Sequence, residues 1–339
     1  MIKFYTIDHL LIFFPYKPMP IIKAQKFKSP SFQFNGHLQT IIPSFLREIE
    51  EVNYTRERIE TPDGDFLDID WSAKGNRKAV LVSHGLEGSA NRHYVKGVIR
   101  LFNQNGWDGI GWNCRSCSGE MNRLPRFYHH ADTPDLSLVI HHILDKKNYN
   151  ELVLVGFSMG GSLTLKYFGE RGEKVRPEIK KGIAVSVPCD LTDCSIELEK
   201  KSKIFYNKRF FKKLSEKVKA KAELMPELIS VEPLEKYKIK SLRKFDQNYT
   251  APLHGFKSAE DFYDKASSIH HLSGIRKPVL LINALNDPFL VDKCYPEDLA
   301  KKSDFLNLEL PQNGGHVGFE LKGKKETYTE LRALEFAEY

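Results

Sequence analysis

Residues 152–162 read LVLVGFSMGGS and constrain the fold more than any other part of the sequence. Four branched apolar residues lead directly into Gly156, and a single hydroxyl, Ser158, then stands among glycines. A short continuous apolar run is typical of a buried parallel strand, and the following MGGSLTLKYFGE has apolar residues at helical spacing. A strand, a sharp turn and a helix form the setting in which a G-x-S-x-G pattern exposes a nucleophilic serine.

The glycines have a steric role in such a turn. The serine is held in a strained backbone conformation, and side chains at Gly156 and Gly160 would crowd it. Because the pattern is short and also arises by chance, the interpretation depends on the flanking strand and helix and on partners elsewhere in the chain.

Strand and helix patterns alternate along most of the sequence. Residues 56–72 predict two antiparallel strands around a turn at 62–64, and further strands are predicted at 78–84, 108–113, 152–155, 181–188, 277–284 and 305–311. Helices are predicted at 92–107, 135–147, after 158 and at 325–339. This order predicts an α/β fold with a mostly parallel, eight-stranded sheet flanked by helices. Functional groups should lie at the carboxyl ends of the strands.

The spacing of these elements predicts how the chain is divided. Residues 31–188 and 258–339 are expected to form the core, and residues 189–257, too long for a simple crossover, a helical cap inserted above it. Residues 1–30 form an N-terminal segment, for which a start at Met1 or at Met19 is left open. The first twenty residues lack the small-residue cleavage site of a signal peptide, and Asp8 and His9 interrupt their apolar patch.

The predicted cap contains a basic segment. From Lys201 to Lys221 there are nine basic residues and one acid, Glu216. An apolar stripe accompanies them, formed by Phe210, Phe211, Leu214 and Val218. We favour a solvated basic face with the stripe packed on the core; the alternative is a basic face in peripheral contact with an anionic lipid surface.

Charge and cysteine content exclude several classes of protein. A net charge of +7 without an aromatic-interleaved basic motif does not indicate nucleic-acid binding. No apolar run is long enough to span a bilayer. Five cysteines, an odd number, favour free thiols and a cytoplasmic location. A zinc site from Cys114, Cys117, Cys189 and Cys194 is disfavoured because the spacing of the second pair is loose, so no metal is expected.

A nucleophilic serine needs a base, and the chain has twelve histidines. His316, in a glycine-bearing loop after the last predicted strand, meets the strand-end criterion, whereas His141, His142, His270 and His271 lie in or at the end of predicted helices. Asp287 follows a strand and lies between Ser158 and His316 in chain order, and it is the favoured orienting acid because Pro288 would help to fix the turn that it occupies. Asp190, after the preceding strand, is the second candidate.

Two backbone amides are expected to stabilise an oxyanion. One belongs to Met159, the residue after the serine, at the start of its helix. The other is assigned to Leu86 in the loop SHGLEGS, where Gly85 allows a close approach of the backbone. His84 is expected to brace this loop.

Taken together, HGLEG, GFSMGG, NALNDPF and GGHVGF resemble the α/β-hydrolases in content and order. FNGHLQTIIP and NCRSCSGEMNRLPRFYH narrow the resemblance to the YheT-like branch, the fourth AB-hydrolase family of predicted esterases and acylglycerol lipases. It covers about Gln33 to Phe336 and implies that Ser158, Asp287 and His316 are catalytic. The family's R-G-C-S-G commonly has glycine where this chain has Ser116. Arg115, His37 and Tyr128 are candidates to line or brace the site, without assigned roles.

These features predict a serine hydrolase that cleaves small-molecule acyl esters, including acylglycerols, through a Ser-His-Asp triad and an acyl-enzyme intermediate. No cofactor is required, and an apolar acyl pocket is expected under the cap. A thioesterase, amidase or acyltransferase using the same triad is one alternative, since fold alone does not fix the reaction. A non-catalytic protein that binds lipid surfaces through the basic segment is the other. The sequence does not determine the oligomeric state.

Overall fold

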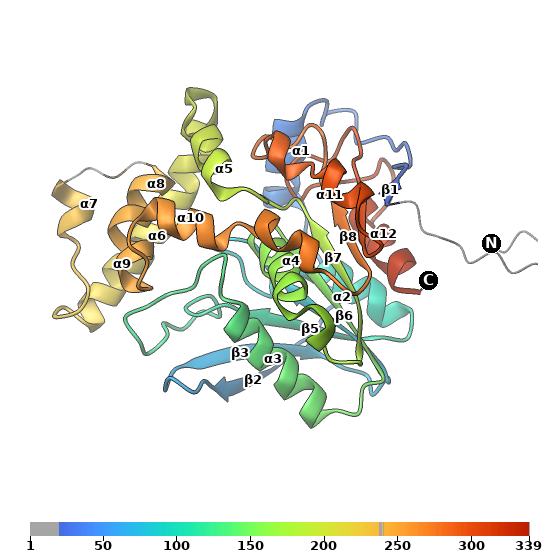
Figure 1. Cartoon of the computed structure of the whole chain (residues 1–339), viewed down its shortest axis with the longest axis horizontal. Coiled ribbons are helices and arrows are strands. Elements are labelled where there is room, and N and C mark those ends of the chain that lie inside the picture. Colours follow the sequence, from blue (N-terminus) through green and yellow to red (C-terminus); the bar gives the residue numbers. More distant parts are fainter. Residues whose placement is uncertain (1–19, 237–238, 240, 339) are drawn as a thin grey trace, which may run out of the picture.

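The computed structural model describes residues 20–236, 239 and 241–338, and every structural statement below concerns these residues. The two alternative starts, Met1 and Met19, lie outside them. A nine-stranded sheet runs through the centre of the molecule (Figure 1) in the order β1-β9-β8-β7-β6-β4-β5-β3-β2. Its strands are β1 (Ile21–Ile22), β2 (Thr55–Glu60), β3 (Phe66–Ser72), β4 (Lys78–Ser83), β5 (Asp108–Asn113), β6 (Glu151–Phe157), β7 (Ile179–Val185), β8 (Val279–Ile282) and β9 (Leu306–Glu309).

The predicted mostly parallel sheet is confirmed. Only β3 runs antiparallel to its neighbours, β2 and β5, and the other pairs are parallel. The eight predicted strands correspond to β2–β9, so the predicted count was one too low for the described residues. The additional strand, β1, pairs Ile21 with Leu308. Two residues carry no periodicity of their own, and this strand exists only through pairing with a distant part of the chain.

Helices cover both faces of the sheet. The helices of the first half are α1 (Gly36–Leu46), α2 (His93–Gln104), α3 (Thr133–Lys146), α4 (Met159–Arg171) and η1 (Gly172–Lys174). The helices between β7 and β8 are α5 (Leu191–Glu199), η2 (Lys201–Lys203), α6 (Ile204–Leu224), α7 (Glu232–Lys236), α8 (Leu242–Phe245), η3 (Asp246–Thr250), α9 (Ala251–Leu253), α10 (Ala259–Ala266) and η4 (Ser268–Gly274). The last are η5 (Asp292–Cys294), α11 (Glu297–Lys301) and α12 (Tyr328–Glu338).

Alternate residues of the central strands point to opposite faces and build two cores. Val80 and Val82 of β4 pack with residues of α2 and α12, whereas Ala79 and Leu81 pack with α3 and α4. Both faces of β6 are apolar in the same way, which explains its unbroken run of branched side chains. Figure 1 shows α6–α10 gathered at one side of the molecule, away from α12 and β1. The boundaries predicted for a separate cap remain a prediction.

The basic segment of α6 differs from the favoured interpretation. Its stripe does pack on the core, with Leu214 and Val218 buried and Phe211 against them. However, only Lys201, Lys208, Lys212 and Lys219 are exposed. The other five basic residues of this segment are buried or partly buried: Lys203, Arg209, Lys213, Lys217 and Lys221. The prediction of a solvated basic face was therefore wrong for these five. Acceptors in distant segments hold Arg209, Lys213, Lys217 and Lys221, whereas Lys203 lies 3.7 Å from Glu197 of the neighbouring α5.

Candidate active site

Ser158 stands at the turn between β6 and α4. Its backbone has φ 54° and ψ −116°, a conformation that non-glycine residues rarely adopt. The neighbouring glycines permit this turn. A Cβ at Gly156 would lie 2.1 Å from the carbonyl oxygen of Gly160, and a Cβ at Gly160 would lie 2.3 Å from that of Ser83. The two glycines of the G-x-S-x-G pattern are therefore needed because the backbone packs too closely at both positions to leave room for a Cβ.

The structure brings Ser158, His316 and Asp287 together. His316 Nε2 lies 2.9 Å from Ser158 Oγ, and His316 Nδ1 lies 2.9 Å from Asp287 Oδ2. The Asp287 side chain is fully buried, and 9% of the His316 side chain is exposed. This is the geometry in which a carboxylate accepts from Nδ1–H and leaves Nε2 free to take the serine proton.

Asp287 is held by its own turn, whereas Asp190 is engaged elsewhere. Asp287 Oδ1 accepts a 2.9 Å hydrogen bond from the Phe289 amide, and the Phe289 ring lies 4.2 Å from the imidazole of His316, centroid to centroid. Asp190 caps α5 by accepting from the Asp193 amide and pairs with Lys293 at 3.2 Å. The structure therefore places the favoured acid, and not the second candidate, beside the histidine.

Helix α1 braces the loop that carries His316. Thr40 Oγ1 accepts from the His316 amide at 2.8 Å and donates to the Gly36 carbonyl at 2.7 Å. Gln39 Oε1 accepts from the Gly314 amide at 2.8 Å. These roles were not predicted from the sequence, although FNGHLQT carries both side chains. The signal was the adjacent polar pair Gln39 and Thr40, which is buried in α1.

The two amides proposed for the oxyanion lie next to Ser158. Met159 is the first residue of α4, and Leu86 follows Gly85, whose backbone lies against the serine: a Cβ there would be 3.2 Å from Ser158 Cβ. Among the described residues, neither the Leu86 nor the Met159 amide has an acceptor within the protein. Both amides are therefore available to a ligand, as an oxyanion hole requires.

His84 and Tyr128 brace the loop that carries Leu86. His84 Nδ1 lies 2.7 Å from the Gly85 carbonyl, and its Nε2 accepts from the Cys114 amide at 3.1 Å. Burial lowers the pKa of His84 to about 4, so this imidazole is neutral at pH 7 and braces the loop as predicted. The Tyr128 hydroxyl accepts from the Glu87 amide at 2.7 Å and donates to the Glu87 carboxylate at 2.6 Å.

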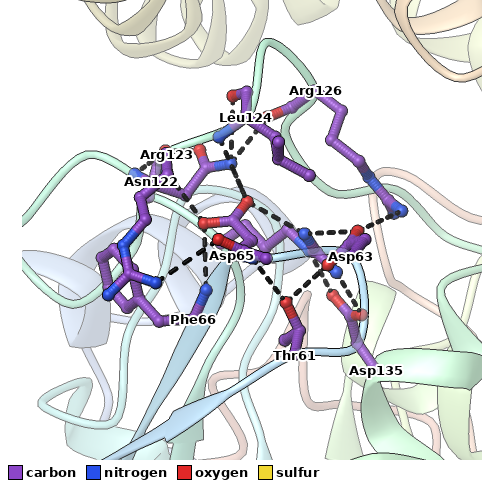
Figure 2. A network of polar contacts seen from close by, with 12 residues as sticks. Thr61, Asp63, Asp65, Phe66, Asn122, Arg123, Leu124, Arg126 and Asp135 are labelled. Carbon is purple, nitrogen blue, oxygen red and sulfur yellow. Dashed lines mark hydrogen bonds and ion pairs between the residues drawn. The ribbon is translucent and has the colours of Figure 1, made fainter.

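Arg115 and His37 lie outside the triad. Figure 2 shows the polar network around Asp63, Asp65 and Asp135, all three of which pair with Arg115 at 2.8–3.0 Å. Ser116 has φ 60°, the left-handed conformation that suits the family's glycine, and its hydroxyl accepts from the Asn122 amide at 3.1 Å. Arg115 thus holds the 114–128 loop to the turn between β2 and β3 and to α3.

His37 links α1 to α6. Its Nδ1 lies 2.9 Å from the Tyr206 hydroxyl, and burial lowers its pKa.

Two cavities meet at Ser158. The first, of about 120 Å³, extends beneath the helices between β7 and β8 and is lined mainly by apolar side chains, including Phe127, Leu191, Leu214, Phe245 and Phe262. The second, of about 110 Å³, lies toward α1 and the start of α2. Five residues border both cavities: Leu86, Ser158, Phe210, Phe289 and His316. The Ser158 side chain therefore lies at a junction with space on two sides.

The cysteines do not form the zinc site considered above. Cys117 Sγ lies 3.4 Å from Lys217 Nζ, whereas Cys194 Sγ lies 3.4 Å from Cys294 Sγ. All five cysteines are free. In the described part of the chain, no group of three or more His, Cys, Asp or Glu residues is arranged to hold a metal ion.

The sheet order, the elbow and the three aligned side chains define the class of protein. The sequence model of the alpha/beta hydrolase fold family matches residues 78–323, and the chain belongs to this family. The Escherichia coli (strain K12) protein named "Putative esterase YheT" is 32% identical over 291 residues, covering 84% of each chain. The resemblance to the YheT-like branch is thereby confirmed.

Other relatives have named activities on lipids. The mouse protein "Phospholipase ABHD3" is 31% identical over 291 residues, covering 83% of this chain and 70% of the relative. The Saccharomyces cerevisiae "Monoacylglycerol lipase" is 26% identical over 347 residues, covering 87% of this chain and 77% of the relative. Among solved structures, the Pyrococcus furiosus esterase Pf2001 has the same fold, with 18% identity, a TM-score of 0.55, and coverage of 85% of this chain and 89% of that one.

No described helix is both long enough and apolar enough to cross a membrane.

Proposed function

We propose that this chain is a serine hydrolase of carboxylic esters. The observation that carries the proposal is the hydrogen-bonded series Asp287–His316–Ser158 at the junction of two cavities, with the Leu86 and Met159 amides beside it. Relatives named as an esterase, a phospholipase and a monoacylglycerol lipase support the same class of reaction. The cytoplasmic location expected from the free thiols remains a prediction.

The proposed reaction has two halves. Ser158 Oγ attacks the ester carbonyl carbon while its proton passes to His316 Nε2, and the Leu86 and Met159 amides hydrogen-bond the resulting oxyanion. The C–O bond to the alcohol breaks, and the alcohol leaves with the proton from His316. Water then gives a proton to His316 and attacks the acyl carbon. Ser158 recovers its proton as the carboxylic acid is released, and Asp287 keeps the imidazole in the required tautomer throughout.

The cavity beneath α5, α6 and α8 is lined mainly by apolar side chains. We therefore propose that it holds the acyl chain of the substrate. Its lining places Leu214, Phe245 and Phe262 where a hydrocarbon would replace water, which favours medium or long acyl chains over acetate. We therefore propose acyl esters of glycerol and related alcohols as substrates.

A fluorophosphonate probe tests the nucleophile directly. The purified wild-type protein should be labelled on Ser158, and Ser158→Ala should lose both labelling and ester turnover by several orders of magnitude. Ser162→Ala is the matched control: its hydroxyl is one turn further along α4 and faces His130 at 3.4 Å, so labelling should persist. A wild-type protein that resists the probe, or a Ser158→Ala variant that still turns over ester, would contradict the proposal.

Two further measurements separate the alternatives. A panel of ester, thioester and amide substrates with one acyl chain should show the highest kcat/KM for the ester. Liposome binding that falls with salt and survives Ser158→Ala, in a protein without turnover, would instead indicate a lipid-surface-binding protein.

A further inference from the structure

The second cavity beside Ser158 carries positive charge from two separate elements. Arg92 precedes α2 and Arg209 lies on α6, and both line this cavity together with His93. We call this group of three residues the cationic chamber. No aspartate or glutamate is among the described residues that line the cavity. The walls therefore bring like charges together without an opposite charge between them.

Two nearby arginines are paired with acids, unlike those of the chamber. Arg47 pairs with Glu330 at 2.8 Å, and Arg100 pairs with Glu51 and Glu326 at 3.2 and 3.1 Å. Arg209 donates to the Ser44 hydroxyl at 2.9 Å and lies over the Phe45 ring, and it has no carboxylate partner among the described residues. Within the part of the chain that the structure describes, the Arg92 guanidinium has no hydrogen bond and no ion pair.

The electrostatic cost of this arrangement is visible in neighbouring groups. Burial and the charge of Arg92 lower the pKa of Arg209, and the same two causes lower the pKa of Lys213, one turn further along α6. Burial and the charges of Arg47, Arg92 and Arg209 lower the pKa of His93 to about 3. An anion in the chamber would relieve this repulsion, whereas a neutral group would leave it in place.

The start of α2 adds uncharged donors to the same wall. The helix begins at His93, has no acidic residue in its first turn, and its N-cap residue Arg92 makes no side-chain capping hydrogen bond. His93 Nδ1 is buried without a hydrogen-bond partner. A helix N-terminus and two guanidinium groups at the wall of one cavity together offer what a phosphate or carboxylate requires.

We propose that the cationic chamber binds an anionic group on the alcohol part of the ester. The apolar cavity takes the acyl chain, Ser158 stands between the two cavities, and the leaving alcohol therefore enters the chamber with its phosphate or carboxylate toward Arg92 and Arg209. This inference rests on the proposed ester hydrolysis and adds to it a substrate class: acyl esters of phosphorylated or carboxylated alcohols.

The test compares three substrates with one acyl chain: a 1-acylglycerol, its 3-phosphate, and the acyl ester of glyceric acid. The measured quantity is the ratio of kcat/KM for each anionic ester to kcat/KM for the neutral one. Arg92→Gln and Arg209→Gln should each lower this ratio by about 10-fold or more, since hydrogen bonds to charged groups are the strong ones. Lys212→Gln, an exposed cation on the same helix with 77% of its side chain exposed, should change the ratio by less than about twofold.

The two anionic esters distinguish the sources of the charge. A larger effect on the phosphate ester indicates phosphate as the ligand, and a larger effect on the glycerate ester indicates a carboxylate. An unchanged ratio in both arginine variants, with neutral turnover intact, would overturn the inference while leaving ester hydrolysis standing.

A binding measurement keeps the inference separate from catalysis. Glycerol 3-phosphate titrated into the wild-type protein in a calorimeter should bind, and Arg209→Gln should weaken its binding by about 10-fold or more. If no ester is turned over, the proposed function is wrong. The titration still shows whether the cationic chamber binds an anion. Glycerol 3-phosphate binding that is absent, or equal in wild type and Arg209→Gln, would refute it.

Discussion

Replacing Thr40 with valine tests whether α1 positions His316 for its proposed role as the base. The substitution keeps the shape of the side chain and removes one oxygen. That oxygen accepts from the His316 amide at 2.8 Å and donates to the Gly36 carbonyl at 2.7 Å. Thr40 is 9% exposed, so water cannot fully replace either hydrogen bond. The change therefore acts on His316 through its backbone and removes no hydrogen bond of its ring.

The expected loss follows from the one buried donor left without a partner, the His316 amide, because the Gly36 carbonyl still accepts a helical hydrogen bond within α1. An unsatisfied buried donor costs about 1–3 kcal/mol, so Thr40→Val should lower the free energy of unfolding by roughly 1–3 kcal/mol in urea denaturation. If the His316 loop also shifts, the imidazole moves relative to Ser158 Oγ. A displacement of about 1 Å can cost on the order of 100-fold in rate, so kcat should fall by at least about 10-fold while KM changes little.

Thr40→Ser is the matched control, because it restores the hydroxyl and removes only the methyl group. Its kcat should remain close to that of the wild type. Equal kcat for Thr40→Val and the wild type would refute the bracing role of α1, and so would an equal loss in both Thr40 variants.

Three further predictions concern the elbow, α6 and acid stability. Gly160→Ala places a Cβ 2.3 Å from the Ser83 carbonyl oxygen, so it should destabilise the fold by about 1–3 kcal/mol and abolish labelling by a fluorophosphonate; normal labelling would contradict the account of the elbow. Lys221→Met should cost at least about 2 kcal/mol in urea denaturation, because three acceptors lose the ammonium, whereas exposed Lys219→Met should cost little. The pKa of His84 is about 4 in the folded protein and 6.5 in the unfolded chain, so the unfolded chain binds the proton more readily. The free energy of unfolding should therefore be highest above pH 6.5 and fall by roughly 3 kcal/mol as the pH falls toward 4. In His84→Gln the free energy of unfolding should depend less steeply on pH over this range.

The sheet and the three aligned side chains were predictable because their signals are local. An unbroken apolar run marks a strand buried on both faces, and the carboxyl ends of parallel strands lie at one edge of the sheet. Ser158, Asp287 and His316 each follow such a strand, so chain order and strand ends placed all three among the candidates, with Asp190 left open as a second acid. Gly156 and Gly160 were informative because backbone contact excludes any side chain there.

The parts that were not predictable depend on contacts between distant segments. Strand β1 exists only through its pairing with β9, across almost the whole described chain. The buried lysines of α6 look like surface residues in the sequence, since nothing near Lys221 indicates that Asn122 and Leu124 supply its acceptors. Nothing in the local sequence distinguishes Thr40 from the other threonines, because its role depends on contact with the distant His316 loop. Hydrogen bonds of this kind leave no periodic pattern.

The inward-facing lysines of α6 have a consequence for how substrate reaches Ser158. Lys217 pairs with Glu87 at 2.8 Å, and Lys221 donates to Asn122 and Leu124 at 2.6–2.7 Å. If α6 moved outward as a rigid body, the ammonium groups of Lys217 and Lys221 would lose these hydrogen bonds, and their acceptors would be left without partners. An opening of the apolar cavity on this side would therefore have to break these hydrogen bonds or leave α6 in place.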